Sequence, residues 1–79
     1  METKPKRIAR TKVNNYIINT CLFNGRYETA VKLEGRDYIV VQTYDCLTYA
    51  EIGHKHWSRV CETNPLYAID VTDGKQKLF

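Results

Sequence analysis

Apolar residues are interspersed with polar ones through the stretch from Tyr16 to Tyr44, and two turn signals divide this stretch into three runs. Asn24-Gly25 is the stronger signal, because a two-residue type I′ loop needs positive φ at both central positions. Gly35-Arg36 is the second signal. The pattern therefore predicts an antiparallel meander of three strands.

Two-residue loops at both turns would fix the register of this meander. The predicted partners are Tyr16 with Leu33, Ile18 with Val31, Leu22 with Tyr27, Leu33 with Tyr38, Val31 with Val40 and Tyr27 with Tyr44. One face, the candidate core, would hold Tyr16, Ile18, Thr20, Leu22, Tyr27, Thr29, Val31, Leu33, Tyr38, Val40, Gln42 and Tyr44. Ile39 and Val41 would then lie on the uncovered reverse face, whereas a three-residue second loop would turn them inside.

A helix signal follows the meander. Thr48 and Glu51 have the spacing of a capping box, and Leu47 and Ile52 stand where a hydrophobic staple would place them. Apolar or small residues then recur at helical spacing at Ala50, Gly53, Trp57 and Val60, with Cys61 at the margin. The segment predicts an amphipathic helix that packs on the sheet and is ended by Asn64-Pro65.

The remaining segment, Leu66 to Val71, predicts a short fourth strand whose pairing partner the sequence does not determine. Asp73-Gly74 predicts a turn into the tail, Lys75 to Phe79. The expected fold belongs to the α+β class: an antiparallel sheet of three or four strands with one helix packed on one face, in the order β-β-β-α-β. With 79 residues, the chain is expected to form a single small domain over residues 1–79.

Composition limits the expected partners and the expected cellular compartment. The net charge of +3 permits an acidic or nucleic-acid partner without requiring one. Three cysteines without a CxxC pair are typical of reduced thiols in a cytoplasm. No apolar run approaches the roughly 20 residues of a membrane span, and the first residues lack the apolar segment of a signal peptide. We therefore expect a soluble cytoplasmic protein that does not associate with membranes.

Positive charge gathers in residues 1–12, which form a basic N-terminal arm. Its cations are Lys4, Lys6, Arg7, Arg10 and Lys12, against the single acid Glu2. One interpretation is an arm that contacts nucleic-acid phosphates, because clustered cations release counterions from the phosphate backbone. The other is a mobile, solvated terminus whose last part, Ile8 to Val13, extends the first strand.

No arrangement of residues indicates catalysis or metal binding. His54 and His56 are two residues apart, so on a helix they point in different directions and cannot share one metal ion. Cys61 lies seven residues from His54 on one helical face, too far for a direct hydrogen bond. The glycines are scattered and form no phosphate-binding loop. We therefore expect no catalytic residues, no metal, no cofactor and no enzymatic activity.

Binding surfaces are the better hypothesis, because six tyrosines and one tryptophan are many for so short a chain and both residue types anchor interfaces. The candidate partner-binding residues are Phe23, Ile39, Val41 and Tyr49, on a surface that a partner protein or a second copy in a homodimer could cover. The alternative is a sheet-type nucleic-acid-binding protein, whose candidate residues are Lys4, Lys6, Arg7, Arg10, Lys12, Arg26, Lys32 and Arg36. Glu28 and Glu34 on the same side count against this alternative.

Several short motifs resemble a known group of proteins. They are Tyr27-Glu28-Thr29-Ala30-Val31, Tyr44-Asp45, Ala50-Glu51 and Gly53-His54-Lys55-His56-Trp57. In this span, Tyr27 to Trp57, the chain resembles short proteins of unknown function encoded by bacteriophages and prophages of Gram-positive bacteria. The resemblance implies a phage accessory protein in the host cell cytoplasm that acts by stoichiometric binding and inhibits a host or defence protein. It implies no catalytic residues.

Overall fold

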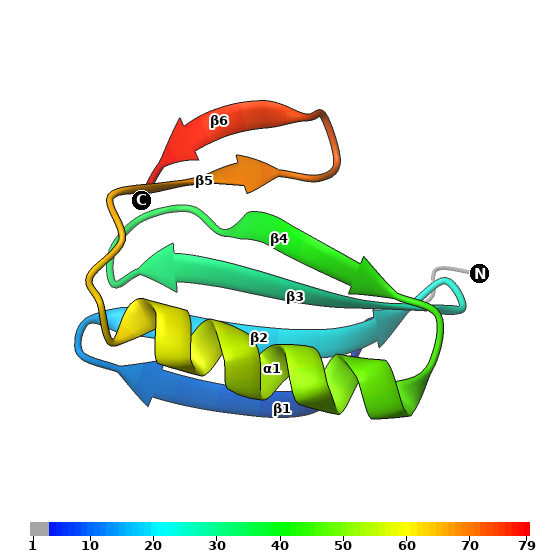
Figure 1. The fold of residues 1–79 in the computed structure, drawn as a ribbon. Coiled ribbons are helices and arrows are strands. Elements are labelled where there is room, and N and C mark those ends of the chain that lie inside the picture. Colours follow the sequence, from blue (N-terminus) through cyan, green and yellow to red (C-terminus); the bar gives the residue numbers. More distant parts are fainter. Residues whose placement is uncertain (1–3) are drawn as a thin grey trace.

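The fold is built around a four-stranded antiparallel sheet with a single helix on one face (Figure 1). The computed structural model describes residues 4–79. Its elements in chain order are β1 (Lys6–Val13), β2 (Tyr16–Phe23), β3 (Arg26–Leu33), β4 (Ile39–Tyr44), α1 (Leu47–Cys61), β5 (Tyr67–Asp70) and β6 (Lys75–Leu78). The four-stranded sheet has the order β1-β2-β3-β4, and β5 pairs with β6 in a separate sheet. The predicted α+β class, with a helix packed on an antiparallel sheet, is confirmed.

The hairpin between β2 and β3 forms as its turn residues predict. Asn24 and Gly25 have φ values of 51° and 77°, as a type I′ loop requires. The observed pairs include Tyr16 with Leu33, Ile18 with Val31 and Leu22 with Tyr27. The predicted register of this hairpin is therefore confirmed, and Ile18 and Val31 lie fully buried at the centre of the sheet.

The register predicted for β3 and β4 is wrong beyond Thr29, because β4 contains a β-bulge. The observed pairs are Tyr27 with Tyr44, Glu28 with Thr43, Thr29 with Gln42, Ala30 with Val40 and Val31 with Ile39. Val41 is the extra residue of the bulge, and it reverses the alternation of side chains between the two faces. Ile39 pairs with the buried Val31 for this reason.

The first strand of the sheet is one that the predicted element order did not contain. β1 pairs antiparallel with β2 and makes one edge of the sheet, and Asn14 takes a φ of 54° in the turn between them. Residues 6–12 of the predicted basic arm are therefore held in a strand, whereas residues 1–3 lie outside the described residues. The observed order is β-β-β-β-α-β-β.

α1 begins two residues earlier than the capping-box spacing predicts. The N-cap residue is Cys46, whose side chain makes no capping hydrogen bond, and the Ala50 amide donates to the Cys46 carbonyl at 3.1 Å. Thr48 lies inside the first turn, so the predicted capping box is wrong. The helix ends at Cys61, before Asn64-Pro65, and Asn64 leaves it with a φ of 54°.

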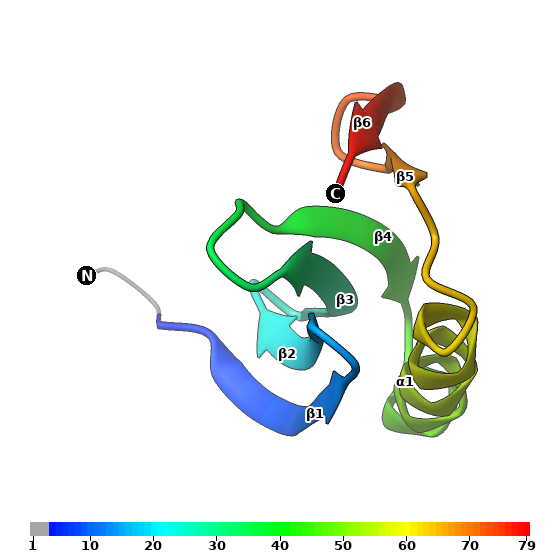
Figure 2. The same cartoon turned by 90° about the vertical axis from the view of Figure 1, so that its left-hand side faces the viewer.

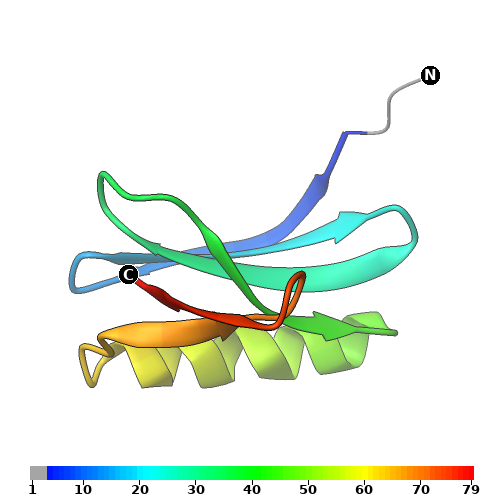
Figure 3. The same cartoon turned by 90° about the horizontal axis from the view of Figure 1, so that it is seen from above.

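α1 runs along the strands on the concave side of the curved sheet (Figures 2 and 3). Its buried residues are Ala50, Gly53, His54 and Cys61. Trp57 and Val60, which were predicted to lie in the packing stripe, are only half buried. The buried face of α1 therefore includes a histidine that the apolar pattern did not assign to it.

The chain after α1 forms a β5–β6 hairpin instead of one strand and a tail. The Phe79 ring packs edge-on against the Tyr16 ring at 5.5 Å between centroids, and the Val71 amide donates to the Val40 carbonyl at 2.8 Å. Asp70 accepts hydrogen bonds from the Lys77 ammonium and the Thr72 hydroxyl at 2.8 and 2.6 Å. These contacts hold a two-stranded sheet that would be only marginally stable alone.

Candidate binding surfaces

The four residues predicted to bind a partner do not form one surface. Ile39 and Val41 are 3% and 6% exposed, so the prediction that they lie on an uncovered face is wrong. The bulge in β4 turns them towards α1. Phe23 and Tyr49 are exposed, but Phe23 ends β2 on the face away from α1, whereas Tyr49 stands on α1 itself. They therefore lie on different sides of the sheet.

The β5–β6 hairpin carries an exposed apolar surface that the sequence did not reveal. Tyr67 pairs with Leu78, and Ile69 lies two residues further along the same face of β5. We call these three side chains, which are 49% to 71% exposed, the apolar hairpin face. Leu66 and Val71, at the two ends of β5, are also exposed. The alternation that produces this face lasts only four residues, too short for a reliable strand signal.

Cations from β1 and β3 share the sheet face that α1 does not cover. Residues that pair across neighbouring strands form a row, and all members of a row point to the same face of the sheet. Rows on the open face alternate with rows that face α1, which include those of Ile18 and Thr20. One row contains Lys12, Ile17 and Lys32. We call the set Arg7, Arg10, Lys12, Arg26 and Lys32 the basic sheet face.

Charge on the basic sheet face is only partly neutralised. Lys12 lies 3.2 Å from Glu34 and Arg26 lies 3.5 Å from Asp45, in two solvent-exposed ion pairs. The Lys32 ammonium instead sits 5.0 Å from the centre of the Tyr38 ring. Within residues 4–79, no carboxylate lies within ion-pair distance of Arg7, Arg10 or Lys32. Surface pairs of this kind are worth about 1 kcal/mol or less, so a polyanion could displace them.

The excess positive charge of the chain belongs to this sheet. Residues 46–79 contain four basic side chains (Lys55, Arg59, Lys75, Lys77) and four acidic ones (Glu51, Glu62, Asp70, Asp73). The other predicted phosphate-binding residues lie at its margins. Lys4 precedes β1, Lys6 pairs with Leu22, and Arg36 lies between β3 and β4 in a hollow shared with Lys77 and Leu78 of β6.

A chain of hydrogen bonds crosses the interface between α1 and the sheet. The His54 ring bonds through Nε2 to the Thr11 hydroxyl at 2.8 Å and through Nδ1 to the Thr20 hydroxyl at 2.7 Å. The Thr20 and Thr29 hydroxyls lie 2.7 Å apart, and the Tyr44 hydroxyl donates to Thr29 at 3.1 Å. This series of hydrogen bonds therefore links β1, β2, β3 and β4 to the helix.

The series of hydrogen bonds ends at the protein surface, at Gln42. The Trp57 indole donates to Gln42 Oε1 at 2.9 Å, and the Tyr44 hydroxyl is 3.4 Å from the same oxygen. An indole N–H can only donate, so this contact identifies the oxygen of the Gln42 amide. The Tyr44 hydroxyl also lies against the Gly53 backbone, where any β-carbon would overlap it. Glycine at this position therefore allows β4 and α1 to approach closely.

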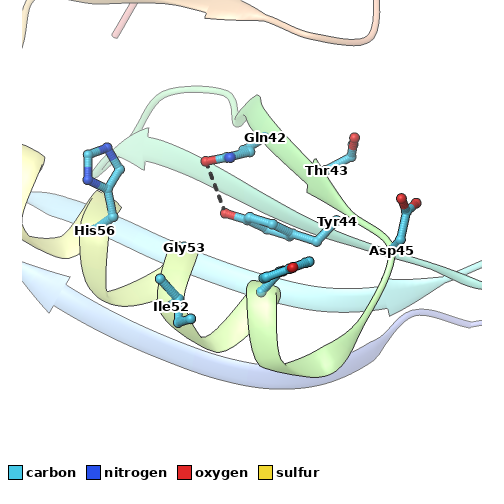
Figure 4. A pocket seen from close by; sticks show the side chains of 8 residues that line it. Gln42, Thr43, Tyr44, Asp45, Ile52, Gly53 and His56 are labelled. Atoms are coloured by element: carbon cyan, nitrogen blue, oxygen red, sulfur yellow. Dashed lines mark hydrogen bonds between the residues drawn. The ribbon is translucent and has the colours of Figure 1, made fainter.

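A groove of about 490 Å³ opens between β4 and α1 above this contact (Figure 4). Its lining residues are Gln42, Thr43, Tyr44, Asp45, Tyr49, Ile52, Gly53 and His56. Figure 4 shows the Tyr44 ring lying across the groove with its hydroxyl directed at Gln42. Of the predicted partner-binding residues, Tyr49 lines this groove.

The titratable groups at these sites are shifted by burial. Burial lowers the pKa of His54 below its ordinary value of 6.5 and raises the pKa of Cys61 to about 11. Burial, followed by Glu28, raises the pKa of Cys21 against the opposing effect of Arg7. Both thiols are therefore protonated near neutral pH and are poor nucleophiles.

Within residues 4–79, no three side chains of His, Cys, Asp or Glu lie close enough together to hold a metal ion. No helix in the same range has both the length and the apolar character needed to cross a bilayer.

Comparison with protein-family models, with curated protein sequences and with solved structures found no match for this chain.

Proposed function

We propose that this chain acts by stoichiometric binding to a partner protein through the apolar hairpin face. The observation that carries the proposal is that Tyr67, Ile69 and Leu78 are 49% to 71% exposed on one side of a two-stranded sheet. Grouped apolar side chains of this kind are uncommon on monomeric proteins and typically mark a contact with another protein. Tyr67 provides the aromatic anchor that such interfaces favour.

The class of partner is the second part of the proposal. We propose that the partner is a host or defence protein in the cytoplasm of an infected cell, and that binding inhibits it. This part is supported by the resemblance of Tyr27 to Trp57 to phage and prophage proteins. It agrees with a small chain whose exposed apolar groups could occupy a site on a larger protein.

The experiment captures a partner from nuclease-treated lysate of a Gram-positive host and measures its binding to the purified chain by calorimetry. We expect a fixed stoichiometry and little loss of affinity between low and moderate salt, since apolar contacts are weakly screened. Ile69→Lys should weaken binding at least tenfold. Thr63→Lys adds the same charge in the exposed turn that follows α1 and should leave affinity unchanged.

Equal affinity of the Ile69→Lys and Thr63→Lys variants would refute the proposed use of the hairpin. A second copy of this chain is the other possible occupant. In that case sedimentation would reveal a dimer that Ile69→Lys converts to a monomer, and the proposal of a different partner protein would be wrong.

Nucleic-acid binding is a second candidate, and the strand register favours it. β1 brings Arg7, Arg10 and Lys12 onto the same open face as Arg26 and Lys32. Phosphate contacts from three to five of these cations would give a log–log salt slope of roughly −3 to −4.5 on duplex DNA. A deletion of residues 1–12 would remove most of β1, so point substitutions are the appropriate test.

Fluorescence anisotropy with a labelled DNA duplex measures this slope. Arg10→Ala should reduce its magnitude by about one and weaken binding to all sequences alike. Arg59→Ala, on the exposed surface of α1, is the matched control and should change nothing. Absence of binding at low salt, or equal slopes for both variants, would exclude the basic sheet face as a phosphate site.

A further inference from the structure

The groove between α1 and β4 lies beside an open strand edge. β4 is the last strand of its sheet, and β3 occupies only one of its two edges. Within residues 4–79, the backbone bond from the Val71 amide to the Val40 carbonyl is the one that joins the outer edge of β4 to the hairpin. Figure 1 shows that the β5–β6 hairpin diverges from β4 towards the C-terminal end of β4. The edge from Gln42 to Tyr44 is therefore open.

The open edge and the groove belong to one site. Gln42, Thr43, Tyr44 and Asp45 line one side of the groove, and Tyr49, Ile52, Gly53 and His56 of α1 line the other. An unpaired edge presents backbone N–H and C=O groups at the spacing of another strand. The groove of about 490 Å³ provides space for side chains that alternate along such a strand.

Gln42 adds an oriented donor at the same edge. Its Oε1 faces the Trp57 indole and the Tyr44 hydroxyl, so Nε2 is directed away from them. No acceptor within residues 4–79 meets this Nε2 group, and the side chain is exposed. It can therefore donate to a carbonyl of a segment that lies along β4.

We propose that this groove binds an extended, uncharged peptide segment of a partner chain, which adds as a strand to the open edge of β4. An apolar side chain of the segment packs between Tyr49 and Ile52, which are 63% and 60% exposed. The only carboxylate in the lining, Asp45, is paired with Arg26. The lining contains no Lys, Arg or Glu, and its one Asp is paired. Because no charged group of these types is left without a partner, an uncharged segment fits the groove best.

This site goes beyond the proposed function, because it uses backbone hydrogen bonds and lies on a different surface from the apolar hairpin face. The two surfaces can be tested separately. Ile69→Lys changes the hairpin face, and Ile52→Glu places a charge on the apolar wall of the groove. Both positions are exposed, so neither change removes a core contact.

The experiment selects displayed random nonapeptides on the immobilised chain. Enriched peptides are then synthesised with capped ends, and their Kd is measured by fluorescence anisotropy. We expect Ile52→Glu to weaken binding at least tenfold, whereas Lys55→Glu on the outer surface of α1 and Ile69→Lys should each change Kd less than twofold. Circular dichroism of each variant checks that the fold is retained.

Backbone recognition has its own test. N-methylation removes one peptide donor at a time, and strand addition predicts alternation: every second N-methylated position loses binding, and the positions between them do not. Hydrogen exchange should slow when peptide binds at those amides of residues 42–45 that point to the open edge. Failure to enrich any peptide, equal binding to Ile52→Glu, or insensitivity to N-methylation would each overturn the proposed site and leave the hairpin proposal untouched.

Discussion

Replacing Gly53 with alanine tests the close contact between α1 and β4. In an exposed helix, this change stabilises by about 1 kcal/mol, because glycine has the greater backbone freedom to lose. Here, a β-carbon at residue 53 would overlap the hydroxyl oxygen and the ring of Tyr44. The Tyr44 ring is buried, and its hydroxyl donates to Thr29, so the ring cannot move without breaking that bond.

The overlap should outweigh the gain in helix propensity. Inserting a methyl group into a filled interior costs about 1–3 kcal/mol. A lost hydrogen bond adds about 1 kcal/mol. After subtraction of about 1 kcal/mol for propensity, the net loss is about 1–3 kcal/mol. In a domain of this size, that loss lowers Tm by about 5–20 °C.

Urea unfolding followed by the fluorescence of the single tryptophan, Trp57, measures this loss. Lys55→Ala, at an exposed position of α1, is the control and should change stability little. The decisive comparison places Gly53→Ala in a Tyr44→Leu background, where the overlap is gone and the alanine should now stabilise the fold. Equal or higher stability of Gly53→Ala in the natural background, or the same sign in both backgrounds, would refute the reasoning.

The buried polar groups carry three more predictions. Because burial holds the pKa of His54 below 6.5, the unfolded chain gains a proton before the folded chain does, so the contribution of His54 to the free energy of unfolding should be constant above about pH 6.5 and decrease below it. Urea unfolding at a series of pH values checks this, and His54→Gln should flatten that part of the profile. Thr20→Val leaves His54 Nδ1 without its partner and should cost about 1–3 kcal/mol, whereas Thr43→Val at an exposed site should cost little. Burial acts to raise the pKa of Asp70, but the hydrogen bonds from Lys77 and Thr72 prevail and lower it to about 2. The stability contributed by Asp70 should therefore be present above about pH 4 and be lost as pH falls towards 2, and Asp70→Asn should remove this dependence in acid unfolding.

Turn chemistry explains which parts of the sheet could be predicted. Asn24-Gly25 fixes the β2–β3 register locally, because both residues accept positive φ and no distant contact is needed. The bulge at Val41 has no such local cause. The bulge places both Ile39 and Val41 in the core. This placement is favourable because a helix and a strand from other parts of the chain cover the two side chains. A rule that counts only alternation within one strand therefore assigns them to the wrong face.

The edge strand and the buried histidine were missed for related reasons. Asn14 forms the turn before β2 in a left-handed conformation that asparagine tolerates, but Asn14-Asn15 is a weaker hairpin signal than Asn-Gly. His54 follows Ala50 by four residues and precedes Cys61 by seven, so its position on the buried face was available from spacing. Its burial depends on Thr11 and Thr20, which come from two other strands.

The hydrogen bonds beneath α1 give the proposed groove a fixed shape. The centre of the sheet contains the fully buried Thr20 and Thr29 beside Ile18 and Val31, so its helix-facing surface is not purely apolar. Apolar contacts alone would tolerate a small shift of α1 along the strands, whereas a buried polar group that loses its partner costs about 1–3 kcal/mol. Such a shift would separate His54 from Thr20 and would press the Tyr44 hydroxyl out of its place against the Gly53 backbone. Because α1 and β4 are the two walls of the groove, the network that fixes their separation also preorganises the site, which reduces the ordering cost of binding an extended segment.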